Sequence, residues 1–204
     1  MMTLTFLPGF SRHVLRSVPV AWALLVATPV NSDCNGWTID RLMQAMQETR
    51  SDHASFVEKK SIAMLDKPVE SSGELFYTAP DRMEKRTLKP KPESMILDGD
   101  SLVFERGGKK RRFQLQETPE LAAFIASIRG ILAGDRAALE RNYGLSLEGS
   151  ADDWTLQLLP LDEKIHAVVT SIRISGVRNA VRSIETAQAD GDSSLMLIER
   201  LADP

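Results

Sequence analysis

The sequence predicts a single, mainly β-sheet domain with a few helices, folded as a half-open antiparallel barrel. Three observations predict this class. Eleven short segments with strand-like composition follow one another, and a run of adjacent strands favours an antiparallel meander because parallel strands need a crossover each time. Pairs typical of tight turns separate several of them, namely Asp98-Gly99, Gly107-Gly108 and Asp190-Gly191. Two amphipathic helical segments accompany the strands, and a twisted sheet of this width tends to curl.

The eleven candidate strands combine β-branched, aromatic or alternating apolar residues with turn signals at their ends. They lie at Ser55 to Ile62, Ser72 to Ala79, Arg82 to Leu88, Ser94 to Leu97, Leu102 to Arg106, Arg111 to Gln116, Leu145 to Glu148, Trp154 to Leu159, Val168 to Ser175, Val181 to Ala187 and Ser194 to Leu201.

A first helix is expected after Thr38, which is a favourable N-cap residue. Its apolar residues recur at helical spacing and form one stripe: Ile39, Leu42, Met43 and Met46. This stripe must pack on an apolar surface.

The second helical segment is an insert that interrupts the strands in mid-chain. Thr118 is its expected cap, Pro119 occupies the first turn and Gly134 ends it. A shorter helix opening at Asp135 is expected to carry Leu139 and Tyr143 on one side. The long insert has an apolar stripe suited to covering the barrel mouth as a lid, formed by Leu121, Phe124, Ile125, Ile128 and Leu132.

Residues 1–32 are predicted to be a secretory signal peptide, which leaves 33–204 as one domain. Arg12 and Arg16 precede an apolar stretch from Val18 to Val30 that is too short to span a bilayer comfortably. Small side chains at Val30-Asn31-Ser32 suit cleavage after Ser32. A retained membrane anchor is the alternative. Cys34 is not preceded by the small apolar motif that lipidation requires.

The charge balance indicates no nucleic-acid partner. The chain has 25 basic and 28 acidic residues, and cleavage after Ser32 removes two arginines and no acid, giving a net charge of −5. The remaining length is typical of one domain with a sizeable core. We expect a monomer.

The segment from Gly73 to Asp100 carries a family resemblance. In the strand Gly73 to Ala79 both faces are partly apolar, which suits a sheet between a core and something amphipathic. The pattern G-x-L-x-Y-x-x-P-x-R over 73–82, followed by E-S-M-I-L-D-G-D over 93–100, resembles the LolA/LolB-type periplasmic lipoprotein carriers. The resemblance implies an unclosed antiparallel barrel, with an N-terminal helix and a mid-chain helical lid over an apolar cavity.

The chain departs from that family at the corner after this strand. Ala79 stands where the carriers place a basic residue, and Glu84, Lys85 and Arg86 replace apolar and aromatic residues. The chain is therefore more similar to a divergent LolA-like subgroup associated with acyltransferase and exporter systems. A lipid or acylated product is the expected cargo, rather than a lipoprotein.

Large side chains on one consistent strand face, together with the lid stripe, are the candidate cargo contacts; ordinary core packing is the alternative for each. They are Leu75, Tyr77, Met95, Leu97, Leu102, Phe104, Phe113, Leu115, Phe124, Ile125, Ile128, Trp154, Leu156 and Leu158. Basic residues that could meet a lipid headgroup or a docking partner are Arg82, Arg106, Lys109 and Lys110. The alternative for these is a solvated hairpin that discourages edge pairing.

No catalytic, metal or cofactor motif is evident, so we expect a protein that is not an enzyme. After residue 32 the only histidines are His53 and His166, without metal-ligand spacing. The predicted function is a periplasmic carrier that moves lipid from an inner-membrane exporter to an outer-membrane acceptor. The alternatives are a lipid-sensing module of the same fold that signals to an inner-membrane partner, and a hydrolase dependent on one of the two histidines.

Overall fold

A computed structural model describes residues 36–201 of the chain. The described residues belong to one compact unit. The expected signal peptide and Cys34 lie outside the described residues.

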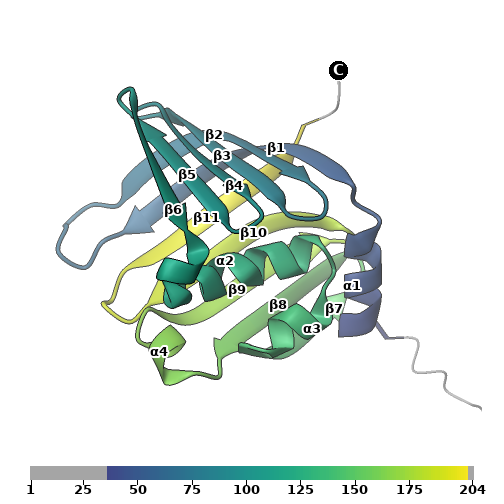
Figure 1. The fold of residues 1–204 in the computed structure, drawn as a ribbon. Coiled ribbons are helices and arrows are strands. Elements are labelled where there is room, and N and C mark those ends of the chain that lie inside the picture. The colour runs from purple at the N-terminus through teal and green to yellow at the C-terminus, as the bar shows by residue number, and fades with distance from the viewer. Residues whose placement is uncertain (1–35, 202–204) are drawn as a thin grey trace, which may run out of the picture. The chain divides into compact units, whose positions relative to one another are not determined.

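All eleven predicted strands are present in one antiparallel sheet (Figure 1). The spatial order is β6-β5-β4-β3-β2-β1-β11-β10-β9-β8-β7, so the first and last strands of the chain pair at the centre and β6 and β7 form the two edges. The strands are β1 Ser51–Ser61, β2 Val69–Thr78, β3 Arg82–Lys89, β4 Glu93–Asp98, β5 Ser101–Arg106, β6 Lys109–Gln114, β7 Tyr143–Ser150, β8 Asp153–Pro160, β9 Val169–Val177, β10 Ala180–Gln188 and β11 Ser193–Arg200.

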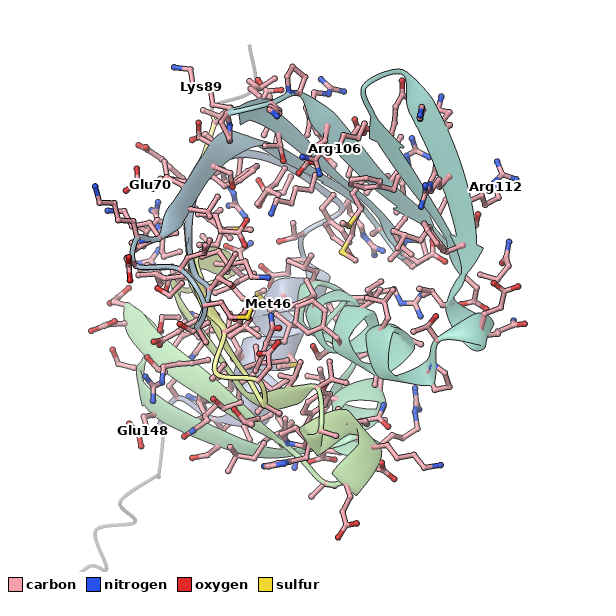
Figure 2. All side chains as sticks on the ribbon, turned by 90° about the vertical axis from the view of Figure 1, so that its left-hand side faces the viewer. Met46, Glu70, Lys89, Arg106, Arg112 and Glu148 are labelled. Carbon is pink, nitrogen blue, oxygen red and sulfur yellow. The ribbon has the colours of Figure 1, made fainter. Side chains whose placement is uncertain are left out.

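The sheet curves around the helices to form the predicted half-open barrel. Figure 2 shows the sheet arching over the interior, with Met46 inside the arch and Glu70 and Lys89 on its outer side. Because β6 and β7 are not paired with one another, the barrel stays open between them.

The two predicted helical segments are confirmed. Helix α1 spans Ile39–Gln47, and the Thr38 hydroxyl accepts a hydrogen bond from the Arg41 amide at 3.3 Å. Helix α2 spans Pro119–Leu132, and α3 spans Arg136–Glu140. The Asp135 carboxylate caps α3 by accepting from the Ala138 amide at 2.9 Å.

The structure corrects several details of these segments. Thr118 occupies the cap position of α2, but its side chain makes no capping hydrogen bond. Tyr143 begins β7 and does not extend α3, because that helix ends at Glu140. A short 3₁₀ turn, η1 (Leu115–Glu117), takes the end of the sixth predicted strand, and a one-turn helix α4 (Glu163–His166) was not predicted.

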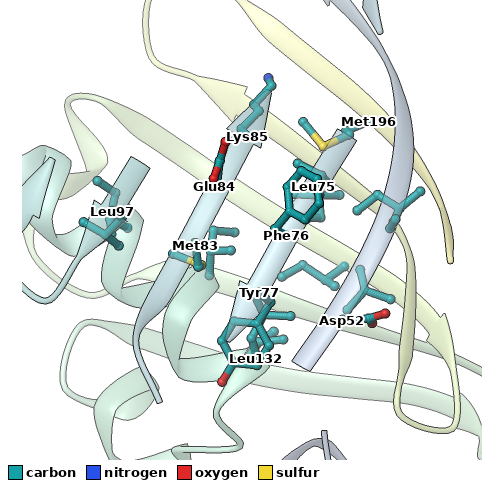
Figure 3. Close-up of a pocket in the computed structure, with 18 of the residues that line it drawn as sticks. Asp52, Leu75, Phe76, Tyr77, Met83, Glu84, Lys85, Leu97, Leu132 and Met196 are labelled. Atoms are coloured by element: carbon teal, nitrogen blue, oxygen red, sulfur yellow. The ribbon is translucent and has the colours of Figure 1, made fainter. Parts of the chain in front are cut away.

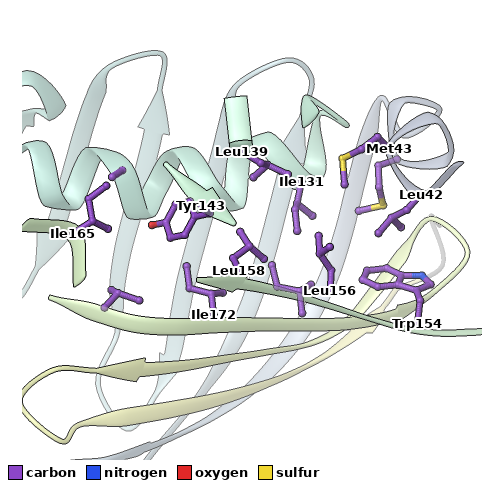
Figure 4. Close-up of a cluster of buried hydrophobic side chains, with 14 residues drawn as sticks. Leu42, Met43, Ile131, Leu139, Tyr143, Trp154, Leu156, Leu158, Ile165 and Ile172 are labelled. Carbon is purple, nitrogen blue, oxygen red and sulfur yellow. The ribbon is translucent and has the colours of Figure 1, made fainter. Parts of the chain in front are cut away.

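The main core lies between the helices and the β7–β9 part of the sheet (Figure 4). Trp154, Leu156 and Leu158 of β8 are fully buried there against α1, α2 and α3. Trp154 also donates a hydrogen bond from its ring nitrogen to the Arg178 carbonyl at 3.0 Å. Gly176 is required beside it, since a Cβ at that position would lie 2.4 Å from the Trp154 ring.

A second, smaller core lies on the other side of α2. Leu97, Leu102 and Leu115 are buried there against Ile125 of the helix. Helix α2 thus packs on two cores at once, which explains why its apolar residues surround most of its circumference.

The helical insert is also held to the barrel by polar contacts. Arg129 of α2 donates to the Gly99 carbonyl at 3.1 Å, and Gln47 of α1 donates to the Gly134 carbonyl at 3.0 Å. Opening the insert must therefore break these hydrogen bonds as well as the apolar contacts of its stripe. None of the helices within residues 36–201 is long and apolar enough to cross a membrane.

Candidate functional site

A cavity of about 320 Å³ lies between α2 and the concave face of the sheet (Figure 3). Residues on β1 to β5 and β9 to β11 line it together with α2 and Met46 of α1. The alternation of side chains along each strand decides which residues can reach it.

One wall of the cavity is a continuous row of apolar side chains across four neighbouring strands. Tyr77 of β2 is opposite Met83 of β3, Met83 is opposite Leu97 of β4, and Leu97 is opposite Leu102 of β5. All four line the cavity. In-register apolar residues on one face therefore build this wall.

The other wall comes from the C-terminal strands. Ile184 of β10 is opposite both Ile174 of β9 and Met196 of β11, and all three line the cavity. Met196 is in turn opposite Glu58 of β1, which joins the two walls at the centre of the sheet. The sequence did not predict residues on these strands as cargo contacts.

Helix α2 closes the cavity from the opposite side. Phe124, Ile125 and Ile128 point to it, together with Ile131 and Leu132 of the last turn. The cavity therefore has apolar groups on both sides, which is the arrangement typical of small-molecule sites of about 300–1,000 Å³.

A charged pair interrupts the apolar lining. Lys85 of β3 is opposite Leu75, on the inner face, and its ammonium group donates to the Glu58 carboxylate. The ammonium also lies 4.8 Å from the centre of the Phe56 ring, and the Ser71 hydroxyl donates to Glu58 at 3.4 Å. The Lys85 and Glu58 side chains are only 28% and 18% exposed.

The pair lies toward one end of the cavity. Figure 3 shows Lys85 and Met196 at one end of the view and Tyr77 and Leu132 at the other. Asp52 lies near the Tyr77 end in the same view, so charged groups border the mostly apolar lining at both ends.

The remaining acidic residues of the lining are paired with arginines. Asp52 accepts three hydrogen bonds of 2.7–2.9 Å from Arg200. Glu84 accepts one from Arg86 at 2.8 Å. Lys85 is the single cation among the lining residues in the described part of the chain.

A protein-family model for outer membrane lipoprotein carrier proteins of the LolA-like type matches residues 27–203. The chain belongs to this LolA-like family.

Solved structures with a similar arrangement of elements share little sequence with this LolA-like chain. A LolA superfamily protein from Nitrosomonas europaea is 12% identical, with a TM-score of 0.45, and the match covers 82% of this chain and 95% of that one. Lipoprotein LppX of Mycobacterium tuberculosis is 8% identical, with a TM-score of 0.44 and coverage of 79% and 91%. The Pseudomonas aeruginosa MucA/MucB complex matches at 14% identity and a TM-score of 0.46, covering 81% of this chain and 56% of that one. No curated protein matches the chain.

Eight of the fourteen candidate cargo contacts line the cavity of this LolA-like protein. They are Leu75, Tyr77, Met95, Leu97, Leu102, Phe124, Ile125 and Ile128. The other six lie elsewhere: Trp154, Leu156 and Leu158 in the main core, Leu115 in the smaller core, and Phe104 and Phe113 beyond the cavity on β5 and β6. Phe113 is 42% exposed.

The four basic residues that the sequence singled out lie outside the cavity lining. Arg82 donates to Asp98 at 3.2 Å on the exposed side of β3 and β4. The Nε atom of Arg106 lies 3.7 Å from a carboxylate oxygen of Glu93, and the Nζ atom of Lys110 lies 3.1 Å from a carboxylate oxygen of Glu105. Lys109 is exposed at the start of β6.

The two histidines are in separate elements, His53 in β1 and His166 in α4. His53 stacks on Phe76 with ring centres 4.3 Å apart. Within residues 36–201, no three His, Cys, Asp or Glu side chains gather as a metal site would require. Burial, together with the nearby Asp81 charge, raises the pKa of Tyr77, so its hydroxyl is neutral at physiological pH.

Proposed function

We propose that this LolA-like protein is a periplasmic carrier of an amphipathic lipid or an acylated product. It would receive the cargo from an inner-membrane exporter and deliver it to an outer-membrane acceptor, acting as a monomer and without chemical change to the cargo. The observation that carries the proposal is the 320 Å³ apolar cavity between the concave face of the sheet and α2.

The energetics of such a cavity support reversible carriage. Each methylene that leaves water contributes about 0.8 kcal/mol, so a long acyl chain supplies on the order of 10 kcal/mol. Apolar contact alone is therefore sufficient to hold the chain. Release requires α2 to move away, which breaks the hydrogen bonds of Arg129 and Gln47 and part of the packing of the helix on the two cores.

The methionines of the lining suit cargo of variable shape. Met46, Met83, Met95 and Met196 all line the cavity. Unbranched thioether side chains adapt to irregular contacts more readily than branched ones do.

A matched pair of substitutions on β1 tests the proposal. Ala54 lines the cavity, whereas Val57 is 47% exposed on the outer face of the same strand. Ala54→Phe should fill the cavity and abolish saturable binding of a fluorescent fatty acid, and Val57→Phe should leave binding unchanged. Circular dichroism would check that both variants are folded. Equal binding by the two variants would contradict the proposal.

The cargo itself can be identified from its source. Protein purified from cells that express the whole chain should carry a lipid that mass spectrometry detects, and Ala54→Phe should carry less of it. A protein that is free of lipid and binds no fluorescent acyl probe, whether a fatty acid or an acyl ester, would not be a carrier.

The hydrolase alternative predicts that the protein cleaves an acyl ester. Turnover of an acyl ester that is lost on changing His53 or His166 to alanine would contradict the carrier. We expect no turnover by the unsubstituted protein.

A further inference from the structure

The Lys85–Glu58 pair is a partly buried ion pair in the lining of the cavity. Both side chains point from the sheet into the cavity, and both belong to its lining. Partly removing two charges from water costs free energy that a fully exposed position would avoid, so a partly buried ion pair is weak evidence of a stabilising role. A role in ligand recognition explains its place in a cavity whose lining is mostly apolar.

The sheet is shaped locally to let this pair form. Gly73 of β2 is opposite Phe56 of β1, and it pairs with Thr87 of β3 beside a shift in register. A Cβ at Gly73 would lie 1.9 Å from the Arg86 carbonyl oxygen, so only glycine fits. Without a side chain at this position, Lys85 can reach across to the Phe56 ring and Glu58.

Other hydrogen-bonding groups lie at the same end of the cavity. Thr186 of β10 and Ser194 of β11 are opposite one another and line the cavity. Ser194 is two residues from Met196, the partner of Glu58 across β1 and β11. This end therefore presents hydroxyl groups beside one ammonium and one carboxylate.

The charge at this end is balanced, which determines the head that fits. An ammonium group has three donors, and a carboxylate has several acceptor positions, so each has capacity beyond their mutual contact. A carboxylate head would approach Lys85 but would also be repelled by Glu58. An uncharged head with hydroxyl and ester groups can accept from Lys85 through either group and donate to Glu58 through a hydroxyl, without repulsion.

From this geometry we infer that the Lys85–Glu58 pair is a headgroup subsite that selects lipids with an uncharged, hydrogen-bonding head over lipids with an anionic head. The inference rests on the proposed carrier function and adds the chemical class of the cargo. Acyl esters of glycerol or of a sugar are the class that fits, and free fatty acids are disfavoured.

A competition experiment tests the subsite directly. Protein from cells that express the whole chain is loaded with a fluorescent acyl probe, which is then displaced at neutral pH by decanoic acid or by its glycerol monoester. The two competitors share one acyl chain and differ in the charge of the head. We expect the unsubstituted protein to bind the monoester about tenfold more tightly, as one charge-assisted hydrogen bond implies.

Removing the carboxylate should change this preference. Glu58→Gln leaves the Lys85 ammonium without its counter-charge, so binding of decanoic acid should strengthen by about tenfold and the preference should disappear or reverse. The double variant Glu58→Gln with Lys85→Met should lose that gain. Glu185→Gln is the matched control, because Glu185 is paired with Arg173 on an exposed part of β10 and does not line the cavity.

The outcomes separate the subsite from the carrier function. Equal binding of the two competitors by the unsubstituted protein would overturn the subsite while leaving the carrier intact, and this result does not depend on how the variants fold. A preference that Glu58→Gln and Glu185→Gln leave equally unchanged would also overturn it. If neither competitor displaces the probe and the probe itself is not bound, the carrier proposal fails as well.

Discussion

Met196 and Leu197 are consecutive residues of β11 that lie on opposite faces of the sheet. Met196 lines the cavity beside Ile184, whereas Leu197 is 54% exposed. Two apolar residues of similar size thus have different surroundings because successive side chains of a strand alternate.

This difference predicts a difference in lipid binding. Met196→Gln should weaken binding of a fluorescent fatty acid by about tenfold, because an amide replaces part of the apolar lining and about 0.8 kcal/mol is lost for each methylene contact. Leu197→Gln should have no measurable effect. Titration of both variants at equal protein concentration checks this, and a similar loss in the two would mean that the lipid does not bind in the cavity.

Substitutions in the core should mainly lower the free energy of unfolding, and substitutions in the cavity should mainly weaken lipid binding. Leu156 is fully buried in the main core and does not line the cavity, whereas Ile128 of α2 does. Leu156→Ala should lower the free energy of unfolding by about 2–5 kcal/mol and keep lipid binding in the folded protein. Ile128→Ala should weaken binding with a smaller loss of stability. Urea unfolding combined with lipid titration would show whether the two effects divide in this way.

The fold could be predicted from sequence because its signals are local. The alternation in strands such as Gly73 to Ala79 and the turn pair Gly107-Gly108 specify hairpins without knowledge of distant contacts. Helix α1 has a capping residue and an apolar stripe within nine residues. Tyr143 was misplaced because an apolar residue three positions after a helix end fits either a longer helix or a new strand.

The site was harder to predict because strand alternation specifies a face but not what covers it. Leu156 and Leu158 are on the concave face, as their pattern implies, yet the helices pack directly on them and leave no space. The four consecutive apolar residues from Leu195 to Ile198 show no alternation, so the lining role of Met196 had no signal. Lys85 was missed because a charged strand residue is ordinarily exposed.

The connection after α2 should be sensitive to its glycine. Gly134 has a φ of +64°, and a Cβ there would lie 2.2 Å from the Met43 carbonyl oxygen of α1. Gly134→Ala should lower the free energy of unfolding by more than the 1–3 kcal/mol of backbone strain, because the clash with α1 adds to it.

Gly107 provides the comparison for this prediction. It has a φ of +57° in the β5–β6 hairpin, but nothing lies within 4 Å of a Cβ placed there. Gly107→Ala should therefore lower the free energy of unfolding by the backbone strain alone. Thermal unfolding of both variants measures the difference, and equal losses would mean that contact with α1 at Gly134 has no energetic weight.

Stability should fall at alkaline pH because of Tyr143. Burial raises the pKa of this tyrosine above its ordinary value of about 10. The folded state therefore holds the proton more tightly than the unfolded state does, and the free energy of unfolding decreases as the pH rises past about 10.

Replacement of the hydroxyl isolates this contribution. Tyr143→Phe should show a weaker decrease in stability than the unsubstituted protein between neutral pH and a pH somewhat above 10. Urea unfolding at several pH values measures the slope of each. An identical slope in the two proteins would assign the alkaline loss to other groups.

The edge strands β6 and β7 are not paired with one another, so no closed ring of hydrogen bonds fixes the diameter of the barrel. The gap between β6 and β7 can widen while every strand keeps its hydrogen-bonded neighbours. Only side-chain contacts with α2 are lost. Separation of these two edge strands would therefore admit a ligand larger than a single acyl chain without breaking any strand pairing in the sheet.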